Sequence, residues 1–196
     1  MVMLCENEYN NFSPILTATK NIVNYLIDNN EDLWKLLYYT DDGILPLEQP
    51  NLTRQQKISM ICTNPYELND NVEKNILFQI MAIDEAFSVA IPQIRIDVGD
   101  IVPMDRVRGY MLINFEIIVP NKQDIFTASY NNVAKRSLAI FQQLAQTLNG
   151  SNIPDSGFQS KMFMDRSSSA GRKTGCIPEQ LSRQYTGLWC VFSVLI

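Results

Sequence analysis

The chain has 196 residues, of which 46% are hydrophobic and 19% are charged, and it contains no histidine. These proportions are ordinary for a globular protein and argue against extensive disorder, while the length suits one large domain or two small ones. The net charge of -5 lies mainly in residues 1–50. A general nucleic-acid-binding protein would show a basic surface instead, so sequence-independent DNA binding is not expected as the main function.

The cysteines and the N-terminal residues indicate the cellular compartment in which the protein is expected. Cys5, Cys62, Cys176 and Cys190 show no CxxC pairing and are typical of scattered, inert thiols. The first residues, MVMLCENEYNN, lack the basic and apolar regions of a signal peptide. No apolar run reaches the ~18 residues of a membrane span. The sequence therefore predicts a cytoplasmic protein without a membrane anchor.

A first helix is expected near the N-terminus. Ser13 suits its N-cap, and Pro14 suits its first helical position, where a missing N–H costs nothing. Asn29 and Asn30 close it. Its apolar residues recur at helical spacing and form one stripe: Ile15, Ala18, Ile22, Val23, Leu26 and Ile27.

A second helix follows directly. Asn30 can cap it, and Glu31 and Asp32 suit the positive end of a helix dipole. This helix is apolar around much of its circumference, so it needs cover on more than one side. Its apolar residues are Leu33, Trp34, Leu36, Leu37 and Tyr38.

The next segment combines a loop with one short helix. Residues 42–50 contain Asp-Gly and two prolines, which predicts an extended loop. Thr53 and Gln56 have the spacing of a capping box. That spacing predicts a short helix that runs through Ile61 and stops before Pro65.

Strand periodicity follows. Residues 75–81 and 89–98 read as strands, and Pro92, which lacks a ladder donor, places the second at a sheet edge or bulge. Residues 110–119 form the clearest strand, because every second residue is apolar. The predicted core face comprises Met111, Ile113, Phe115, Ile117 and Val119, and the partly wet face carries Asn114 and Glu116.

The last third predicts a helix, a loop and a strand. The helix covers residues 128–148 and stops at Asn149-Gly150. Residues 165–184 are rich in serine, glycine and basic residues and predict a long mobile loop. The apolar helix face comprises Val133, Ala134, Leu138, Phe141, Leu144, Ala145 and Leu148, and the final strand alternates inward at Leu188, Cys190, Phe192, Val194 and Ile196.

Helices first, then strands, a helix and strands again predict an α+β fold. We expect a mixed or antiparallel sheet with helices packed on one face, and a long mobile loop before a C-terminal strand. One domain is expected over residues 1–196, with a helical part at about 12–63 and a sheet-plus-helix part at about 74–196.

The sequence offers little catalytic chemistry. Without histidine there is no Ser–His or Cys–His nucleophile pair, and no imidazole can act as a general base or as a metal ligand. The GRKTG run at residues 171–175 departs from the phosphate-binding loop pattern, and residues 40–43 have too few oxygen ligands for a calcium loop. We therefore expect no catalytic residue, no cofactor and no metal.

Interaction chemistry is more prominent. Aromatic residues cluster on the second helix, where they are either core residues or partly a subunit contact, because Tyr and Trp dominate interface anchors. The 165–184 loop has a local charge of +2 and is either a solvated loop or an arm that orders on a partner. The candidate interface residues are Trp34, Tyr38, Tyr39, Arg166, Arg172, Lys173 and Arg183.

Several runs of residues resemble neck proteins of tailed bacteriophages. They are residues 30–39 (NEDLWKLLYY) and 50–57 (PNLTRQQK), together with 94–96 (IRI), which lead through 106–109 (RVRG) into the strand at 110–119. The pattern of a sheet plus a long helix also looks like the tail-terminator and head–tail connector group. The resemblance covers about residues 30–150.

This resemblance implies a virion structural protein, assembled in the host cytoplasm, that forms a sixfold or twelvefold ring around the DNA channel and joins head and tail. Its partners would be copies of itself and other neck, portal or tail proteins, with non-specific contact to channel DNA and none to a membrane. Two alternatives stay open. One is a cytoplasmic adaptor or assembly factor that never enters a particle, and the less favoured one is a His-free enzyme.

Overall fold

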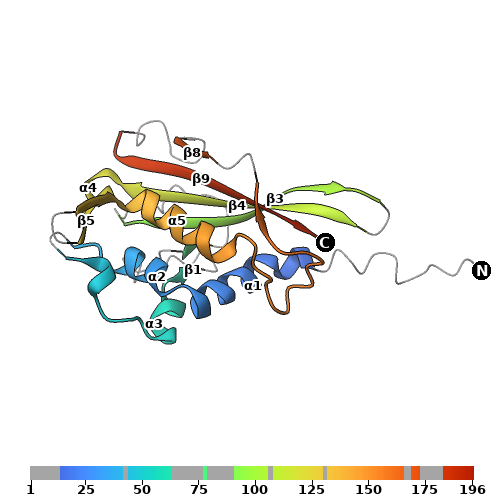
Figure 1. The fold of residues 1–196 in the computed structure, drawn as a ribbon, viewed down its shortest axis with the longest axis horizontal. Helices are drawn as coiled ribbons and strands as arrows, with labels where there is room; N and C mark the ends of the chain where they lie inside the picture. Colours follow the sequence, from blue (N-terminus) through green and yellow to red (C-terminus); the bar gives the residue numbers. More distant parts are fainter. Residues whose placement is uncertain are drawn as a thin grey trace, which may run out of the picture.

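The computed structural model describes residues 14–41, 44–62, 77–78, 91–105, 108–129, 132–165, 169–172 and 183–196. It shows an α+β fold in which helices cover one face of a long sheet (Figure 1). The predicted fold class is therefore confirmed. The proposed N-cap Ser13 lies outside the described residues.

Within the described residues, the main sheet has seven strands in the order β1-β2-β3-β4-β9-β7, and β8 also pairs with β9. The pairs β1–β2 and β2–β3 are parallel, and the other pairs are antiparallel, so the sheet is mixed. The strands are β1 (Ile61–Cys62), β2 (Leu77–Phe78), β3 (Gln93–Pro103), β4 (Gly109–Pro120), β7 (Phe163–Met164), β8 (Ser169–Arg172) and β9 (Tyr185–Leu195).

The inner face of the sheet is built by the alternation seen in the sequence. Every second residue of β4 from Met111 to Val119 is fully buried, and β9 buries Cys190, Phe192 and Val194 in the same way. The rings of Phe115 and Phe192 meet edge to face, with centroids 5.5 Å apart. The predicted register of both strands is confirmed, because a slip by one residue would turn these side chains to the other face.

The helices supply the second layer. They are α1 (Pro14–Asn29), α2 (Glu31–Tyr38), α3 (Arg54–Ser59), the short α4 (Asn121–Asp124), α5 (Arg136–Leu148) and the 3₁₀ turn η2 (Pro46–Glu48). α1 packs on β3, and α5 packs on β4 and β9 (Figure 1). The buried apolar residues of these helices and of the inner sheet face belong to one hydrophobic cluster.

Two helix starts have the predicted caps. The Asn30 side chain accepts a hydrogen bond from the backbone N–H of Leu33 at 2.8 Å and so caps α2. Thr53 and Gln56 form the reciprocal capping box of α3. α2 buries residues around most of its circumference, as its composition predicted, since it packs on both α5 and η2.

The predicted helix over 128–148 is wrong in its first part. α5 begins at Arg136, and the residues before it form a two-stranded hairpin of β5 (Ile125–Ser129) and β6 (Asn132–Lys135). Ile125, Phe126 and Thr127 favour a strand, because β-branched and aromatic side chains fit a pleated surface. Val133 and Leu138, expected on the buried face of the helix, are 65% and 45% exposed.

One prediction in the next segment is wrong, and a second is right for another reason. The predicted short helix ends at Ser59, and Ile61 already belongs to β1, which pairs with β2. The strand expected at an edge or bulge has a register shift between Val98 and Ile101, and among the described residues β2 pairs with it at two residues only. Pro92 is not the cause, because it precedes β3 and its missing N–H removes no ladder bond.

The expected loop over 165–184 is interrupted by a strand. Residues 169–172 form β8 on the edge of β9, and the backbone N–H of Asp165 donates to the carbonyl of Val191 at 2.8 Å. An edge strand presents unpaired N–H and C=O groups, and this segment satisfies part of those of β9. Residues 166–168 and 173–182 lie outside the described residues.

Candidate interaction surfaces

The aromatic residues of α2 serve mainly within the subunit. Trp34 is fully buried, and its indole N–H donates to the carbonyl of Leu26 at 3.0 Å. Trp34 is therefore a core residue, which is one of the two roles that the sequence allowed for it; the other was a subunit contact. Tyr38 and Tyr39 are half-buried with their rings edge to face, and the Tyr39 hydroxyl donates to the carbonyl of Pro50 at 3.1 Å.

The basic candidate residues are separated by the fold. Arg166 and Lys173 lie outside the described residues, and Arg172 ends β8 opposite Leu188. Arg183 is exposed and lines a groove of about 470 Å³ at one end of the sheet. Lys122 of α4 lines the same groove, although the sequence gave no reason to connect the two residues.

Asn121 fixes this basic groove. Its backbone N–H and its side-chain amide donate to the carbonyls of Gln184 and Arg183, each at 2.7 Å, and its side-chain oxygen accepts from the Thr186 hydroxyl at 2.8 Å. The N-terminal end of β9 is thereby tied to α4. Tyr185 lines the groove, and burial raises the pKa of its hydroxyl. Two cations beside amide groups can bind an anion such as a phosphate or a carboxylate.

A buried arginine holds the β5–β6 hairpin against α2. Arg136 is 2% exposed, and its guanidinium donates to the carbonyls of Leu36, Tyr39 and Gln123. The same group lies 5.2 Å from the centre of the Phe126 ring. Burial lowers the pKa of Arg136 to about 10, while the nearby carboxylate of Asp124 acts in the opposite direction. The sequence gave no signal that this arginine would be buried.

One exposed apolar cluster lies where the β3–β4 hairpin extends beyond the helices (Figure 1). Val102 and Tyr110 are cross-strand partners and are 53% and 44% exposed. Met104, at the turn, is 54% exposed. We call these three residues the hairpin patch. On the same sheet face, Phe163 of β7 is 52% exposed and lies opposite Ser193 of β9.

A second apolar cluster lies at the other end of the subunit, on the β5–β6 hairpin (Figure 1). Ile125 and Val133 are both 65% exposed. They share one face of the hairpin, because Thr127 pairs with Val133 and is two residues from Ile125. They border a hollow of about 180 Å³, which we call the β5–β6 hollow. It is lined by Thr40, Asp41, Ile44, Gln123, Ile125, Phe126, Thr127, Val133 and Arg136.

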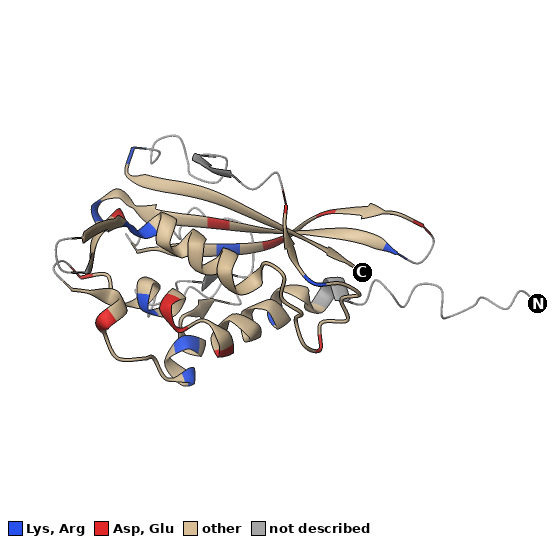
Figure 2. Cartoon of the chain, viewed as in Figure 1, with Lys and Arg blue, Asp and Glu red and all other residues tan. Residues whose placement is uncertain are grey.

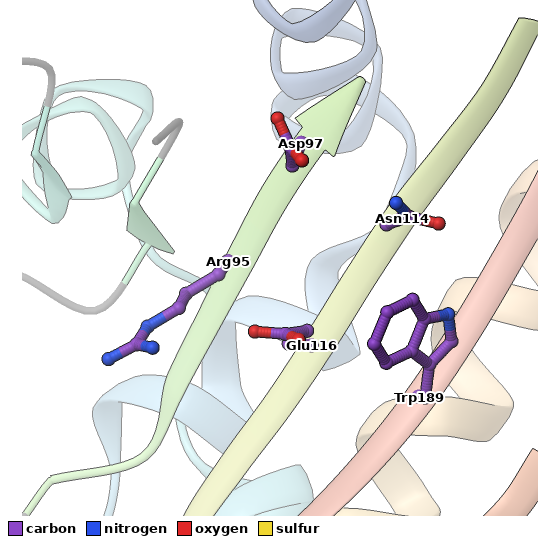
Figure 3. Close-up of a pocket in the computed structure, with 5 residues that line it drawn as sticks. All are labelled: Arg95, Asp97, Asn114, Glu116 and Trp189. Carbon is purple, nitrogen blue, oxygen red and sulfur yellow. The ribbon is translucent and has the colours of Figure 1, made fainter. Parts of the chain in front are cut away.

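The sheet face away from the helices carries a polar row on β3, β4 and β9 (Figure 3). It consists of Arg95, Asp97, Asn114, Glu116 and Trp189, which line a space of about 30 Å³. That volume suits ordered water rather than a substrate. Burial raises the pKa of Asp97, partly offset by a hydrogen bond from the backbone N–H of Val98.

Within the described residues, no group of three or more His, Cys, Asp or Glu side chains is arranged to hold a metal ion. No helix in these ranges combines the length and the hydropathy that a membrane span requires.

The fold and surfaces define a class: an α+β protein with a mixed sheet and exposed apolar clusters at both ends. The family model YomW matches residues 30–170, and the chain belongs to this family. The family name is that of a Bacillus phage-derived protein, so the protein is phage-related. The phage association predicted from the sequence is thus confirmed, and the matched range contains both apolar clusters. No curated protein and no solved structure gives a significant match.

Proposed function

We propose that this protein is a structural subunit of the phage virion that forms a ring in the neck and joins head and tail around the DNA channel. One observation carries the proposal. Two exposed apolar clusters, the hairpin patch and the pair Ile125 and Val133, lie at opposite ends of an elongated subunit (Figure 1).

The arrangement of these clusters favours a ring over a twofold dimer. Contiguous exposed apolar surface on a soluble protein usually marks a contact site. A twofold dimer needs one self-complementary surface, whereas a ring needs two different surfaces that meet head to tail. A subunit with one apolar cluster at each end meets the second requirement. The phage association of the family supports placing that ring in a virion.

The basic groove offers a contact site for the DNA in the proposed channel. Lys122 and Arg183 are both exposed and both line this groove. Figure 2 shows basic residues at the end of the sheet that carries α4. Contacts between such cations and DNA phosphates carry no sequence information but contribute affinity. In the proposed ring, each subunit presents this groove to the DNA or to an acidic neighbour.

The test is the copy number of the protein in purified phage particles. Quantitative mass spectrometry against the portal protein as an internal standard should find a sixfold or twelvefold complement, and gentle disassembly followed by native mass spectrometry should release a ring. Abundant protein in infected cells that is absent from purified particles would overturn the virion role and favour the adaptor or assembly factor. A monomer in free solution would not contradict the proposal, because ring subunits can stay monomeric until their partner protein is present.

A further inference from the structure

We propose that Asn149 is a site of spontaneous deamidation, and that two hydrogen bonds between the C-terminal end of α5 and residues 162–164 hold the reaction back in the folded subunit. We call these two hydrogen bonds the α5–β7 lock. Asn149-Gly150 is the only Asn-Gly pair among the 196 residues. The reaction belongs to the chain itself and does not depend on the proposed function.

Deamidation at this pair needs no reactant other than water. The backbone nitrogen of Gly150 attacks Cγ of Asn149, forms a C–N bond and gives up its proton. The bond from Cγ to the side-chain nitrogen breaks, and ammonia leaves with that proton. Water then opens the cyclic imide at either carbonyl, which yields aspartate or isoaspartate. Glycine has no side chain to obstruct the attack, and Asn149 is exposed to solvent.

The end of α5 holds the pair in a conformation that does not react. Asn149 is the C-cap of α5, and Gly150 follows with a φ of 79°, the left-handed geometry that favours glycine after a helix. The imide ring forms only when the Gly150 nitrogen turns toward Cβ of Asn149, which requires a negative ψ at Asn149. This ψ is 119° in the structure. Rotation about the Cα–C bond of Asn149 must therefore precede the reaction.

The α5–β7 lock engages both reacting groups. The backbone N–H of Gly150, whose nitrogen is the nucleophile, donates to the carbonyl of Met162 at 2.7 Å. The side-chain oxygen of Asn149, on the carbon that is attacked, accepts from the backbone N–H of Met164 at 2.9 Å. Met162 is fully buried, and its own N–H donates to the carbonyl of Ser151 at 2.9 Å, so the partner segment is anchored. The reaction therefore requires a local opening of this junction.

The two products differ in their effect on the lock. Aspartate at this position keeps a side-chain oxygen that accepts from the N–H of Met164. Isoaspartate carries the main chain through the former side chain and adds one methylene group to it. That insertion displaces the N–H of Gly150 from the carbonyl of Met162. Isoaspartate therefore separates the end of α5 from residues 162–164, whereas aspartate leaves the junction closed.

The rate of deamidation tests the protection. The purified subunit is incubated at neutral pH, with and without a denaturing concentration of urea, and the product at Asn149 is followed by peptide mapping with mass spectrometry. We expect the folded subunit to react at least about tenfold more slowly, since each tenfold corresponds to about 1.4 kcal/mol of opening free energy. Equal rates would overturn the protection by the fold. No reaction at Asn149 in urea would overturn the site itself.

The variant Met164→Pro tests the lock directly. Proline lacks the N–H that donates to Asn149, and this N–H is not used in the pairing of β7 with β9. Proline is tolerated at such positions of edge strands. Deamidation at Asn149 in the folded state should become several-fold faster than in the parent.

The matched control is Asp165→Pro, which removes the adjacent backbone donor to the carbonyl of Val191 and leaves both bonds of the lock in place. Equal acceleration in the two variants, or none in Met164→Pro, would contradict the role of the lock. Circular dichroism shows whether each variant is folded. The comparison in urea uses the unchanged chain, so it tests the protection even where a variant does not fold.

The products are compared by amide hydrogen exchange. Aged protein is separated by chromatography, and the fraction with isoaspartate at this position should exchange faster than the parent over residues 150–164. Asn149→Asp should exchange like the parent. Equal exchange in the isoaspartate fraction and in Asn149→Asp would overturn the opening of the junction by isoaspartate.

Discussion

The guanidinium of Arg136 donates a hydrogen bond to the carbonyl oxygen of Leu36 in the last turn of α2. The last carbonyls of a helix have no partner within the helix, and here a side chain distant in sequence supplies one. Lys57 does the same for α1, since its ammonium donates to the carbonyl of Ile27 at 3.0 Å and pairs with Glu31 at 2.6 Å. Buried cations thus join the ends of the N-terminal helices to later elements of the chain.

Replacing Arg136 with methionine should strongly destabilise the fold. The substitution keeps an apolar stem but leaves the carbonyls of Leu36, Tyr39 and Gln123 without this donor and Asp124 without its nearby cation. We expect a loss of about 3–5 kcal/mol in the free energy of unfolding, measured by urea titration. The control is Arg54→Met, whose ion pair with Asp28 is exposed and should contribute about 0–1 kcal/mol. Equal effects of the two substitutions would contradict the role of Arg136.

The core register of β4 can be tested at Phe115, which is fully buried against Phe192. Phe115→Ala should lower the free energy of unfolding by about 3–5 kcal/mol, because the fold loses the buried ring and retains a cavity. Leu112→Ala, in the same strand but on the half-buried opposite face, should have a smaller effect. Reversal of this order would mean that β4 presents its other face to the helices.

Asp97 provides a test by pH. Burial raises its pKa, so the folded state holds this proton more tightly than the unfolded chain does. Ionisation therefore opposes folding at neutral pH, and this cost disappears once the pH falls below the unfolded value of 3.8. We expect Asp97→Asn to be more stable than the parent at pH 7 and equal to it below that value. The exposed Asp100→Asn in the same strand controls for the change in net charge. A gain that persists in acid would point to a cause other than ionisation.

Local sequence patterns predicted the strands that bury one of their two faces in the core. β4 and β9 were recognisable because apolar side chains alternate along each of them, and the core uses that alternation directly. The segment before α5 was misread because Val133 and Leu138 fit a helical spacing that the tertiary structure does not use. The exposed side chain of Val133 lies opposite Thr127 across a hairpin, and a helical period count cannot distinguish these two placements.

The candidate contact surfaces could not be predicted from the sequence. The β5–β6 hollow draws Asp41, Gln123 and Val133 from three separate segments, so no short pattern contains it. The residues Lys135 and Arg136 look like one solvated basic pair, yet Lys135 is exposed and Arg136 is buried. Long-range packing decides which of two adjacent cations becomes part of the core.

The basic groove yields the last prediction. Lys122 and Arg183 are exposed, so Lys122→Glu/Arg183→Glu should leave the free energy of unfolding nearly unchanged. In the proposed ring, weak contacts of single subunits with DNA would add up through multivalency. The rings released from particles should therefore bind a short double-stranded DNA, measured by fluorescence anisotropy, with an affinity that falls as salt rises. Each phosphate contact that is lost reduces the slope of log affinity against log salt by about 0.9.

The matched control for this double variant is Lys20→Glu/Arg54→Glu, which makes the same change in net charge on α1 and α3, away from the groove. If the groove faces the DNA, the variant at Lys122 and Arg183 should lose both affinity and salt slope, while the control loses only the part due to net charge. Indistinguishable losses would show that charge alone sets the binding. An unchanged affinity in both variants would remove DNA as the ligand of the groove and leave an acidic neighbouring subunit, which a pull-down of neck components with each variant would then identify.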